Sequence, residues 1–401
     1  MLALLGSALS ACSNDARQTA PAPDRQLIAE LGRKIFFDTK LSASGRQSCA
    51  TCHDPEHAYA PANGLAVQLG GPNMDQQGAR AVPSLRYVLN KTPFWNKPYV
   101  ASLGERIREG VESPSGGFGW DGRFNTLHEQ AAFPLMANNE MANVSAAQIS
   151  EKLAAADYAP QFRQAFGAHI FDSPSRVYGA ALDAIEQFEL NDASFHPYSS
   201  KFDAFLDGKV ALSASEARGL ALFNDPARGN CASCHIDVKG QDGSHPLLTN
   251  FQYEALGVPR NGEILANADQ AYFDKGVCGP ARADLDGHAD LCGLFKTPSL
   301  RNVASRGAFF HNGYFHTLKA ALEFYVQRDT RPESWYPRTG KEVTKFDDLP
   351  VSERVNVNVI DLPMNNHRGA QPIWNDRDID DVIAFLQTLT DQDVKHAEHR
   401  E

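Results

Sequence analysis

The sequence predicts a mainly α-helical protein with long loops and two similar halves. The motif Cys-x-x-Cys-His occurs twice, at residues 49–53 and 231–235, and a stretch with helical spacing of apolar residues precedes each copy. The segments 236–300 and 329–375 are rich in Gly and Pro with little periodicity, which indicates long functional loops. With 401 residues, the chain is long enough for two domains of ordinary size.

Both motifs are typical of covalent attachment of a c-type haem. Two cysteines three residues apart react with the haem vinyl groups, and the histidine that follows them binds the iron. The residues are Cys49, Cys52 and His53 in the first half and Cys231, Cys234 and His235 in the second. Two structural zinc sites are the alternative, but zinc would need further ligands close to each cysteine pair. We therefore predict two covalently bound haems in two tandem cytochrome c-like domains.

Each motif follows a predicted helix and a loop. In the first half, the apolar residues at positions 27, 28, 31, 35 and 36 share one helical face. In the second half, Ser213 and Glu216 form a capping box ahead of an apolar stretch at residues 220–223. Similar patterns predict further helices at residues 145–156, 175–190, 317–326 and 376–389.

The first residues indicate export. Residues 1–11 are apolar or small and lead into Leu-Ser-Ala-Cys, which resembles a bacterial lipobox, so Cys12 is a candidate for lipidation. The alternative is an ordinary signal peptide cleaved near Ala11, although the positive n-region of such a peptide is missing. Covalent haem and spare cysteines suit an oxidising compartment. We predict a periplasmic protein, with or without a lipid anchor, and no later stretch resembles a membrane span.

We expect three parts along the chain. Residues 1–23 form the signal or lipobox and a polar tether, residues 24–195 the N-terminal haem domain, and residues 196–401 the C-terminal haem domain. The formal charge of −11 argues against nucleic acid as a partner, because phosphate binding needs clusters of basic residues. This charge is compatible with docking of a basic electron-transfer protein.

With both haem motifs placed, the chain resembles the bacterial di-haem cytochrome c peroxidase family, and most closely its MauG-like branch. The resemblance runs from about residue 27 to residue 389. It is carried in the first half by residues 48–55, 119–123 and 129–131 with Pro134, and in the second half by residues 295–302, 310–313 and 317–318. It implies a peroxidatic N-terminal haem domain and an electron-transfer C-terminal one.

The resemblance also implies an open iron at the first haem. In family members that need reductive activation, a loop histidine after the first motif blocks this iron. Residues 58–83 contain no histidine, and His57 is too close to His53 to reach the opposite face. We therefore predict that the first iron is open to hydrogen peroxide at rest.

The distal pocket and the link between the haems follow from the same resemblance. It places Gln130, Pro134 and Glu140 over the first iron, where a carboxylate can move the peroxide proton and an amide can orient the oxygens. It places Trp120 between the haems as an electron relay. The alternatives are a solvated loop carboxylate for Glu140 and ordinary aromatic packing for Trp120.

At the second haem, Tyr325 departs from the pattern of the cytochrome c-oxidising members of the family. Members that oxidise cytochrome c carry a methionine ligand at this position, and an anionic oxygen ligand lowers the haem potential instead. The metal ligands implied are thus His53 at the first iron, with His235 and Tyr325 at the second. A packed aromatic is the alternative for Tyr325, and the rival ligands are Met364, His245, His311 and His367.

Two further sites concern cysteines and calcium. Cys278 and Cys292 flank an insertion and, in an exported protein, are expected to form a disulfide. The family often holds a calcium ion between its domains. The asparagine expected before Pro83 is replaced by Ala81, which removes one calcium ligand and leaves calcium as an open candidate.

We therefore predict an exported di-haem c-type peroxidase. It would use hydrogen peroxide to form a high-valent di-haem state that oxidises a protein or another electron donor, as in the MauG-like branch. The alternative enzyme is a cytochrome c peroxidase that detoxifies hydrogen peroxide with small redox proteins as donors. The alternative outside catalysis is a di-haem electron carrier, which an open first iron argues against. The sequence does not name the substrate.

Overall fold

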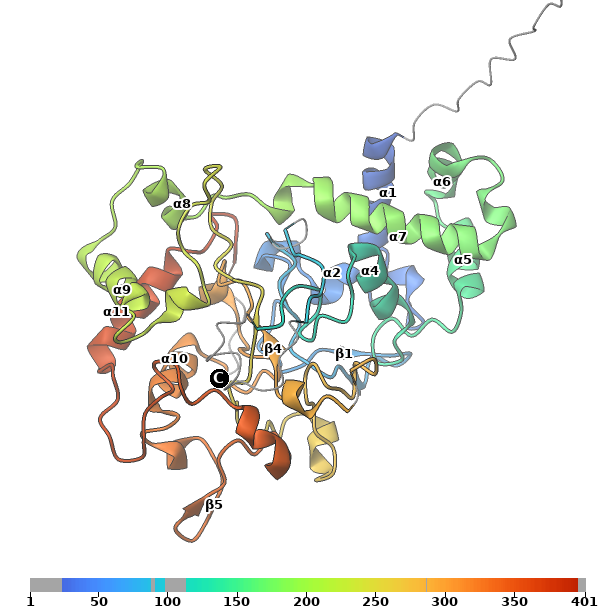
Figure 1. The fold of residues 1–401 in the computed structure, drawn as a ribbon. Coiled ribbons are helices and arrows are strands. Elements are labelled where there is room, and N and C mark those ends of the chain that lie inside the picture. The colour runs from blue at the N-terminus through green and yellow to red at the C-terminus, as the bar shows by residue number, and fades with distance from the viewer. Residues whose placement is uncertain (1–23, 88–90, 98–112, 286, 396–401) are drawn as a thin grey trace, which may run out of the picture.

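The computed structural model describes residues 24–87, 91–97, 113–285 and 287–395. The predicted export segment, with Cys12, lies outside these residues. The chain is mainly helical with long irregular connections, as expected (Figure 1). The α-helices are α1 (Arg25–Phe37), α2 (Cys49–Cys52), α4 (Leu127–Met136), α5 (Ala146–Ala154), α6 (Ala159–Phe166), α7 (Pro174–Asn191), α8 (Lys201–Leu206), α9 (Ala214–Asn224), α10 (Leu318–Gln327) and α11 (Asp376–Gln387).

The strands are short and form three antiparallel pairs. β1 (Leu69–Gly70) pairs with β2 (Gln76–Gln77), β3 (Tyr253–Glu254) with β4 (Phe295–Lys296), and β5 (Arg338–Thr339) with β6 (Glu342–Val343). All the helices predicted from periodicity are present within two residues of their expected ends. Among the described residues, the α-helices that were not predicted are α2, α4, α6 and α8. Within the described residues, no helix is both long and apolar enough to cross a bilayer.

The N-terminal helices pack around the crossing of α1 and α7. Figure 1 shows α1, α5, α6 and α7 together on one side of the molecule. Leu31, Phe162 and Ala184 are among the fully buried residues of this core. At the crossing, Gly32 lies against the backbone of Ala184, and a methyl group on Gly32 would overlap the Ala184 carbonyl oxygen. Glycine is therefore required for the two helices to approach this closely.

The C-terminal core repeats this arrangement. α9 crosses α11 at Gly219, where a methyl group would overlap the carbonyl oxygen of Asp381. Phe385 flanks this contact from α11, as Phe188 of α7 flanks the contact at Gly32. In both halves the glycine-bearing helix precedes the Cys-x-x-Cys-His motif, so the same crossing positions each motif.

α8 begins inside the expected junction at residues 190–205. Its Phe202 belongs to the C-terminal core, where it packs edge-on against Phe385 at 5.3 Å. The Ser200 hydroxyl caps this helix by accepting from the Asp203 amide. A short capped helix of six residues carries too little periodicity to stand out in the sequence.

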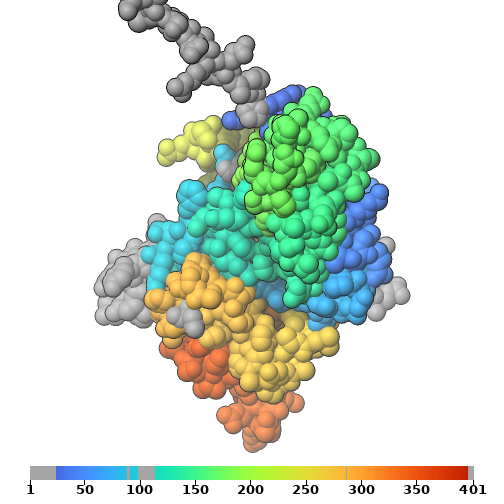
Figure 2. All heavy atoms as spheres, turned by 90° about the vertical axis from the view of Figure 1, so that its right-hand side faces the viewer, coloured from blue at the N-terminus to red at the C-terminus, as the bar shows by residue number. Residues whose placement is uncertain are grey.

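The two parts of the chain are tied together by buried ion pairs. Arg86 bonds to Asp391 and Asp393 near the C-terminus, with nitrogen–oxygen distances of 2.6–3.0 Å. Arg80 bonds in the same way to Asp274 at 2.6 and 2.7 Å. In Figure 2, cyan and teal atoms of the N-terminal part lie directly against yellow and orange atoms of the C-terminal part.

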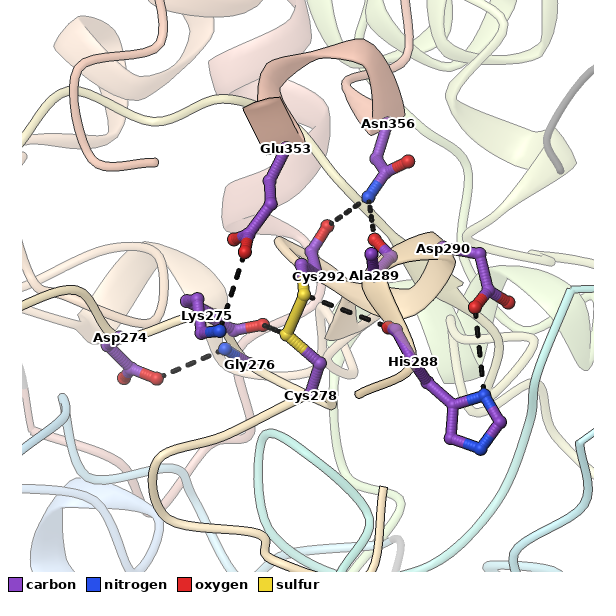
Figure 3. Close-up of a disulfide and its surroundings, with 10 residues drawn as sticks. All are labelled: Asp274, Lys275, Gly276, Cys278, His288, Ala289, Asp290, Cys292, Glu353 and Asn356. Carbon is purple, nitrogen blue, oxygen red and sulfur yellow. Dashed lines mark hydrogen bonds and ion pairs between the residues drawn. A yellow bond between two sulfur atoms is a disulfide. The ribbon is translucent and has the colours of Figure 1, made fainter. Parts of the chain in front are cut away.

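The disulfide expected between Cys278 and Cys292 is confirmed (Figure 3). It closes a loop that lies against residues 351–356. There Glu353 pairs with Lys275 at 3.4 Å, and the Asn356 amide donates to the carbonyls of Ala289 and Cys292. The disulfide and these contacts hold the insertion against residues 351–356.

We predict that Gly219→Ala destabilises the protein by about 1–3 kcal/mol or more, because the added methyl group forces α9 and α11 apart. The matched control is Gly179→Ala on α7, where a methyl group meets open space. That change should leave stability equal or raise it by up to about 1 kcal/mol, through helix propensity alone. Urea unfolding of both variants measures the difference, and equal effects would contradict the close crossing.

Candidate functional site

One internal cavity of about 540 Å³ brings all the predicted site residues together. The residues in its wall include Cys49, Cys52, His53, Trp120, Gln130, Pro134, Glu140, Cys231, Cys234, His235 and Tyr325. They come from both halves of the chain. Sequence separation gave no indication that a single continuous cavity would join them.

The first Cys-x-x-Cys-His motif forms a single helical turn, α2. A capping box between Ser48 and Thr51 starts this turn, which places Cys49 and Cys52 three residues apart on one face. Burial raises the pKa of these thiols to about 12 and about 11, so both stay uncharged. They are not in a disulfide.

His53 is oriented by its own backbone neighbourhood. Its Nδ1 donates to the carbonyl oxygen of Tyr59 at 3.0 Å. This hydrogen bond fixes the tautomer and leaves Nε2 without a proton, which is the ligand form of histidine. Burial lowers the pKa of His53 to about 4, so the imidazole is neutral at physiological pH.

The second motif offers the same side-chain groups as the first, but its backbone conformation differs. Cys231–Ser233 form a 3₁₀ turn rather than an α-helical one. The Nδ1 of His235 donates to the carbonyl oxygen of Leu248 at 2.9 Å, and burial lowers the pKa of this imidazole to about 4. Both motifs therefore present two protonated thiols and one neutral imidazole with a free Nε2.

These features fit two c-type haems. Each motif offers paired thiols for the vinyl groups and an imidazole for the iron, in the wall of a large cavity. The zinc alternative fits poorly. Among the described residues, the groups with metal-ligand spacing contain neither motif: one is Cys278, Cys292 and Glu353, and the other is His128, Asp183 and Glu186.

α4 and the turn that follows it present Gln130, Pro134 and Glu140 to the cavity. A capping box between Thr126 and Glu129 starts this helix, and this sequence signal could have predicted it. After Pro134 the chain turns back, because the Met141 amide donates to the Pro134 carbonyl at 3.0 Å. The Glu140 carbonyl then accepts from Gly71 at 2.7 Å, which holds the turn against β1.

The carboxyl group of Glu140 has a pKa close to neutral pH. Burial raises its pKa to about 7, and the nearby Arg123 offsets this only in part. Among the described residues, the Glu140 carboxylate has no hydrogen-bond partner. The carboxyl group is therefore free to accept or donate a proton in the cavity.

Trp120 is held by both halves of the chain. Its Nε1 donates to the carbonyl of Ala81 at 2.7 Å, and its own carbonyl accepts from the Lys296 amide at 2.9 Å. The next residue, Asp121, is fully buried and pairs with Arg80 at 2.8 Å. The indole is thus fixed at the junction of the two halves, in the wall of the cavity.

Tyr325 projects into the cavity from α10, which Thr317 caps. Its ring packs against Phe310 at 5.5 Å, and burial raises the pKa of its hydroxyl. Within the part of the chain that is described, this hydroxyl has no hydrogen-bond partner. A buried hydroxyl usually finds a partner, so its position is compatible with a metal ligand.

The rival ligands separate into two groups. Met364 and His311 line the cavity, whereas His245 and His367 do not. His311 stacks on Phe295 with centroids 3.5 Å apart and faces Asp348 at 3.5 Å. Met364 therefore remains the alternative ligand to Tyr325.

At the junction, where Ala81 removes one calcium ligand, several backbone carbonyls accept hydrogen bonds. Calcium takes six to eight oxygen ligands, many of them backbone carbonyls. Here the Ala81 carbonyl accepts from Trp120, and the Val82 carbonyl accepts from Arg306 at 2.8 Å. The Gly117 carbonyl accepts from the ammonium group of Lys296.

No histidine of the loop 58–83 lies in the cavity wall, where it could block the first haem. The residues of the loop 58–83 that reach the cavity are Gln68, Leu69 and residues 78–83. His57 lies outside the wall and pairs with Asp54 at 3.1 Å. Four charged residues of the wall were not predicted as site residues: Arg123, Glu189, Lys296 and Arg306. The one sequence signal that could have indicated these residues is a charged side chain within an apolar segment.

The comparisons with known proteins agree with this chemistry. A family model described as di-haem cytochrome c peroxidase matches residues 26–211. The methylamine utilization protein MauG of Paracoccus denitrificans is 31% identical over 94% of this chain and 91% of its own length. The cytochrome c551 peroxidase of Nitrosomonas europaea is 30% identical over 76% of this chain and 74% of its own length.

A solved structure of a di-haem peroxidase is also similar to this chain. The diheme peroxidase BthA from Burkholderia thailandensis superposes with a TM-score of 0.81 and is 38% identical. The match covers 93% of this chain and 87% of that one. At this identity the likeness concerns sequence as well as fold.

We predict that the resting oxidised protein contains one high-spin and one low-spin haem. No histidine of the loop 58–83 is available to block the first iron, whereas the second iron would have Tyr325 or Met364 in the cavity wall as a ligand. Cyanide should therefore bind without prior reduction. Electron paramagnetic resonance near neutral pH measures this, and two low-spin haems that refuse cyanide would contradict the open first site.

Proposed function

Because this chain belongs to the di-haem cytochrome c peroxidase family, we propose that it is a peroxidase of the MauG-like type. It would use hydrogen peroxide to oxidise a protein or another electron donor. The observation that carries this proposal is the unpartnered hydroxyl of Tyr325 in the cavity wall that also bears Cys231 and Cys234. An oxygen ligand there lowers the haem potential and suits storage of oxidising equivalents better than methionine does.

The two haem sites would form two tandem cytochrome c-like domains. The support is the repeated helix crossing, at Gly32 in the first half and at Gly219 in the second. Cys49, Cys52 and His53 would hold the first haem, and Cys231, Cys234, His235 and Tyr325 the second. When bound, the haems supply iron that accepts oxidising equivalents from hydrogen peroxide.

Glu140 would act on the peroxide proton. With a pKa of about 7, its carboxylate is part ionised at neutral pH, so it can take a proton and return it. Gln130 lies one helix turn before Pro134 in the same wall, and its amide can orient the bound oxygens. The apolar neighbours of the cavity exclude bulk water, which strengthens these interactions.

Trp120 would connect the two sites. Its indole is fixed by hydrogen bonds to residues of both halves, so its position does not depend on solvent. A rigid aromatic ring at the junction can pass electrons between the haems. The oxidation could then be shared between sites that are far apart in the sequence.

The second candidate is a cytochrome c peroxidase that removes hydrogen peroxide. Two observations support it: the relatedness to the Nitrosomonas peroxidase, and Met364 in the cavity wall as an alternative ligand. The donor would then be a small redox protein. The identity of the second ligand separates the two candidates.

We further propose that the protein works in the periplasm. The support is the lipobox-like segment that ends at Cys12, together with the disulfide, which suits an oxidising compartment. Lipidation at Cys12 would anchor it to a membrane surface. Mass spectrometry of the mature N-terminus would decide between an anchor and simple cleavage.

Glu140→Gln should slow the reaction of the oxidised protein with hydrogen peroxide by about 10²-fold or more, because it removes the proton carrier. In the parent, the rate should rise as the pH passes upward through about 7, since only the ionised carboxylate can accept a proton. This rise should disappear in the variant. Stopped-flow absorption of the Soret band across pH measures both effects.

The matched control is Glu189→Gln, which removes a different buried carboxyl group of the same wall. It should keep the pH inflection of the parent. A parent-like rate in Glu140→Gln would show that Glu140 takes no part in the reaction.

Tyr325→Met should raise the reduction potential of the second haem, because a thioether favours ferrous iron. Tyr325→Phe should change the potential and spectrum of that haem as well, since it removes the oxygen. Redox titration of both variants beside the parent gives the comparison. Tyr314→Phe is the control, because its ring packs on Phe315 at 4.9 Å and lies outside the cavity wall. Matching potentials in all four proteins would exclude Tyr325 as a ligand.

A further inference from the structure

Glu189 of α7 is a buried carboxyl group in the cavity wall that lacks a partner. The residue is 3% exposed, and it shares the buried face of α7 with Leu182 and Ile185. Its Oε2 atom has no hydrogen-bond partner among the described residues. Glutamate is almost never fully buried unless it is paired, so a structural role in the core does not explain this residue.

Glu189 lies close to the first Cys-x-x-Cys-His motif. Burial is the main cause of the raised pKa of the Cys49 thiol, and Glu189 is the acid with the largest further effect on it, ahead of Glu140. Burial, helped by the Glu186 carboxylate, raises the pKa of Glu189 itself to about 8. The group therefore holds a proton at neutral pH and can donate it into the cavity.

Three acidic residues on α7 lead from the surface to this position: Asp183, Glu186 and Glu189, here called the α7 acids. Residues three apart on a helix have Cβ atoms about 5–6 Å apart, so each acid is a neighbour of the next. His128 belongs to α4, which lies beside α7 (Figure 1). Its Nδ1 is 2.8 Å from a carboxylate oxygen of Asp183. One ligand atom each from His128, Asp183 and Glu186 lies within 4.8 Å of the others.

The outer end of this line is in contact with solvent. The side chain of Asp183 is 56% exposed and that of His128 is 37% exposed, whereas Glu189 at the inner end is buried. Histidine and carboxylate groups exchange protons with water readily near neutral pH. The α7 acids and His128 therefore connect solvent with the cavity wall.

The peroxide reaction needs protons from outside the cavity. Reduction of hydrogen peroxide to two water molecules consumes two electrons and two protons. Glu140 can move a proton from one peroxide oxygen to the other, and that step takes no proton from solvent. The two protons are taken up afterwards, when electrons from the donor return the protein to its resting state. A protein donor supplies its electrons from the surface, so the protons need a separate path.

We propose that the α7 acids and His128 form a proton path, in which Glu189 donates protons to the first haem site while the protein returns to its resting state. Each carboxyl group passes a proton inward and receives another from the group before it, with solvent as the source. The inference rests on the proposed function, because it requires the reaction with peroxide. It explains why acids occupy neighbouring turns of α7, although like charges at such spacing destabilise a helix.

The first experiment separates the two steps by sequential-mixing stopped flow of the haem-loaded protein. Hydrogen peroxide is added first, and ferrocyanide follows as a donor of electrons without protons. Glu189→Gln should leave the first step unchanged and slow the second by about 10²-fold, within the range of general acid catalysis. In the parent, the second step should slow as the pH rises through about 8, because the donor loses its proton. A second step in Glu189→Gln as fast as in the parent would overturn the proposal.

Two further substitutions test the line along α7. Glu186→Gln should slow the second step as well, because it interrupts the supply to Glu189. The matched control is Glu151→Gln, which removes an exposed carboxyl group of α5 and should keep the rates of both steps. Equal rates in Glu186→Gln and Glu151→Gln would overturn the path through Glu186.

Infrared spectroscopy of the resting protein gives a readout that does not depend on turnover. At pH 7 the parent should show the carbonyl stretch of a protonated, buried carboxyl group, and Glu189→Gln should lack it. In deuterium oxide this band should shift, because the path brings solvent deuterons to Glu189. A missing band, or a band that does not exchange, would overturn the role of Glu189 as a donor.

Zinc ions test the outer end of the path in the unaltered protein. Imidazole and carboxylate groups at this spacing are suitable zinc ligands, and a bound ion would occupy the atoms that accept protons. Zinc should therefore slow the second step of the parent without changing the first, and His128→Ala should lose this inhibition. A second step that zinc leaves unchanged would overturn entry at His128.

Failure of this inference can be told apart from failure of the proposed function. A parent protein that does not react with hydrogen peroxide in the first mixing step would overturn the proposed function. A normal first step together with a parent-like second step in Glu189→Gln would overturn the proton path alone.

Discussion

The burial of both Cys-x-x-Cys-His motifs in one shared cavity is the constraint on which the rest of this structure depends. A cofactor bound in this cavity would stabilise the folded state, because it would bind the folded chain and not the unfolded one. The two glycine-bearing helix crossings place the four cysteines that would hold such cofactors.

Burial in the same wall shifts the pKa of several ionisable groups. The two imidazoles are neutral and the four thiols are protonated, which are the forms needed before haem attachment and iron binding. Burial also raises the pKa of Glu140 to about 7, so a single physical cause prepares both the iron ligands and the proton carrier.

Many features of the fold could be predicted because they depend on short-range patterns. The helices around Leu31, Leu222 and Val382 follow from apolar periodicity, and Gly and Pro indicate the long loops. α6 and α8 escaped prediction because they are short, with eight and six residues, whereas α4 contains Pro134 in its last turns. Their apolar faces gain stability from neighbours that are distant in the sequence, and periodicity does not report such contacts.

The sequence by itself determined the haem motifs, the helical class and the disulfide partners, because each depends on residue type and local spacing. It also indicated Gln130, Glu140, Trp120 and Tyr325 through resemblance. Only the tertiary structure decided that these residues share one cavity, and that Met364 and His311 reach it while His245 does not. It also decided that the backbone carbonyls at the junction accept hydrogen bonds from Trp120, Lys296 and Arg306. The physical reason is that pKa shifts and unpaired charges arise from burial, and burial is a property of contacts between distant segments.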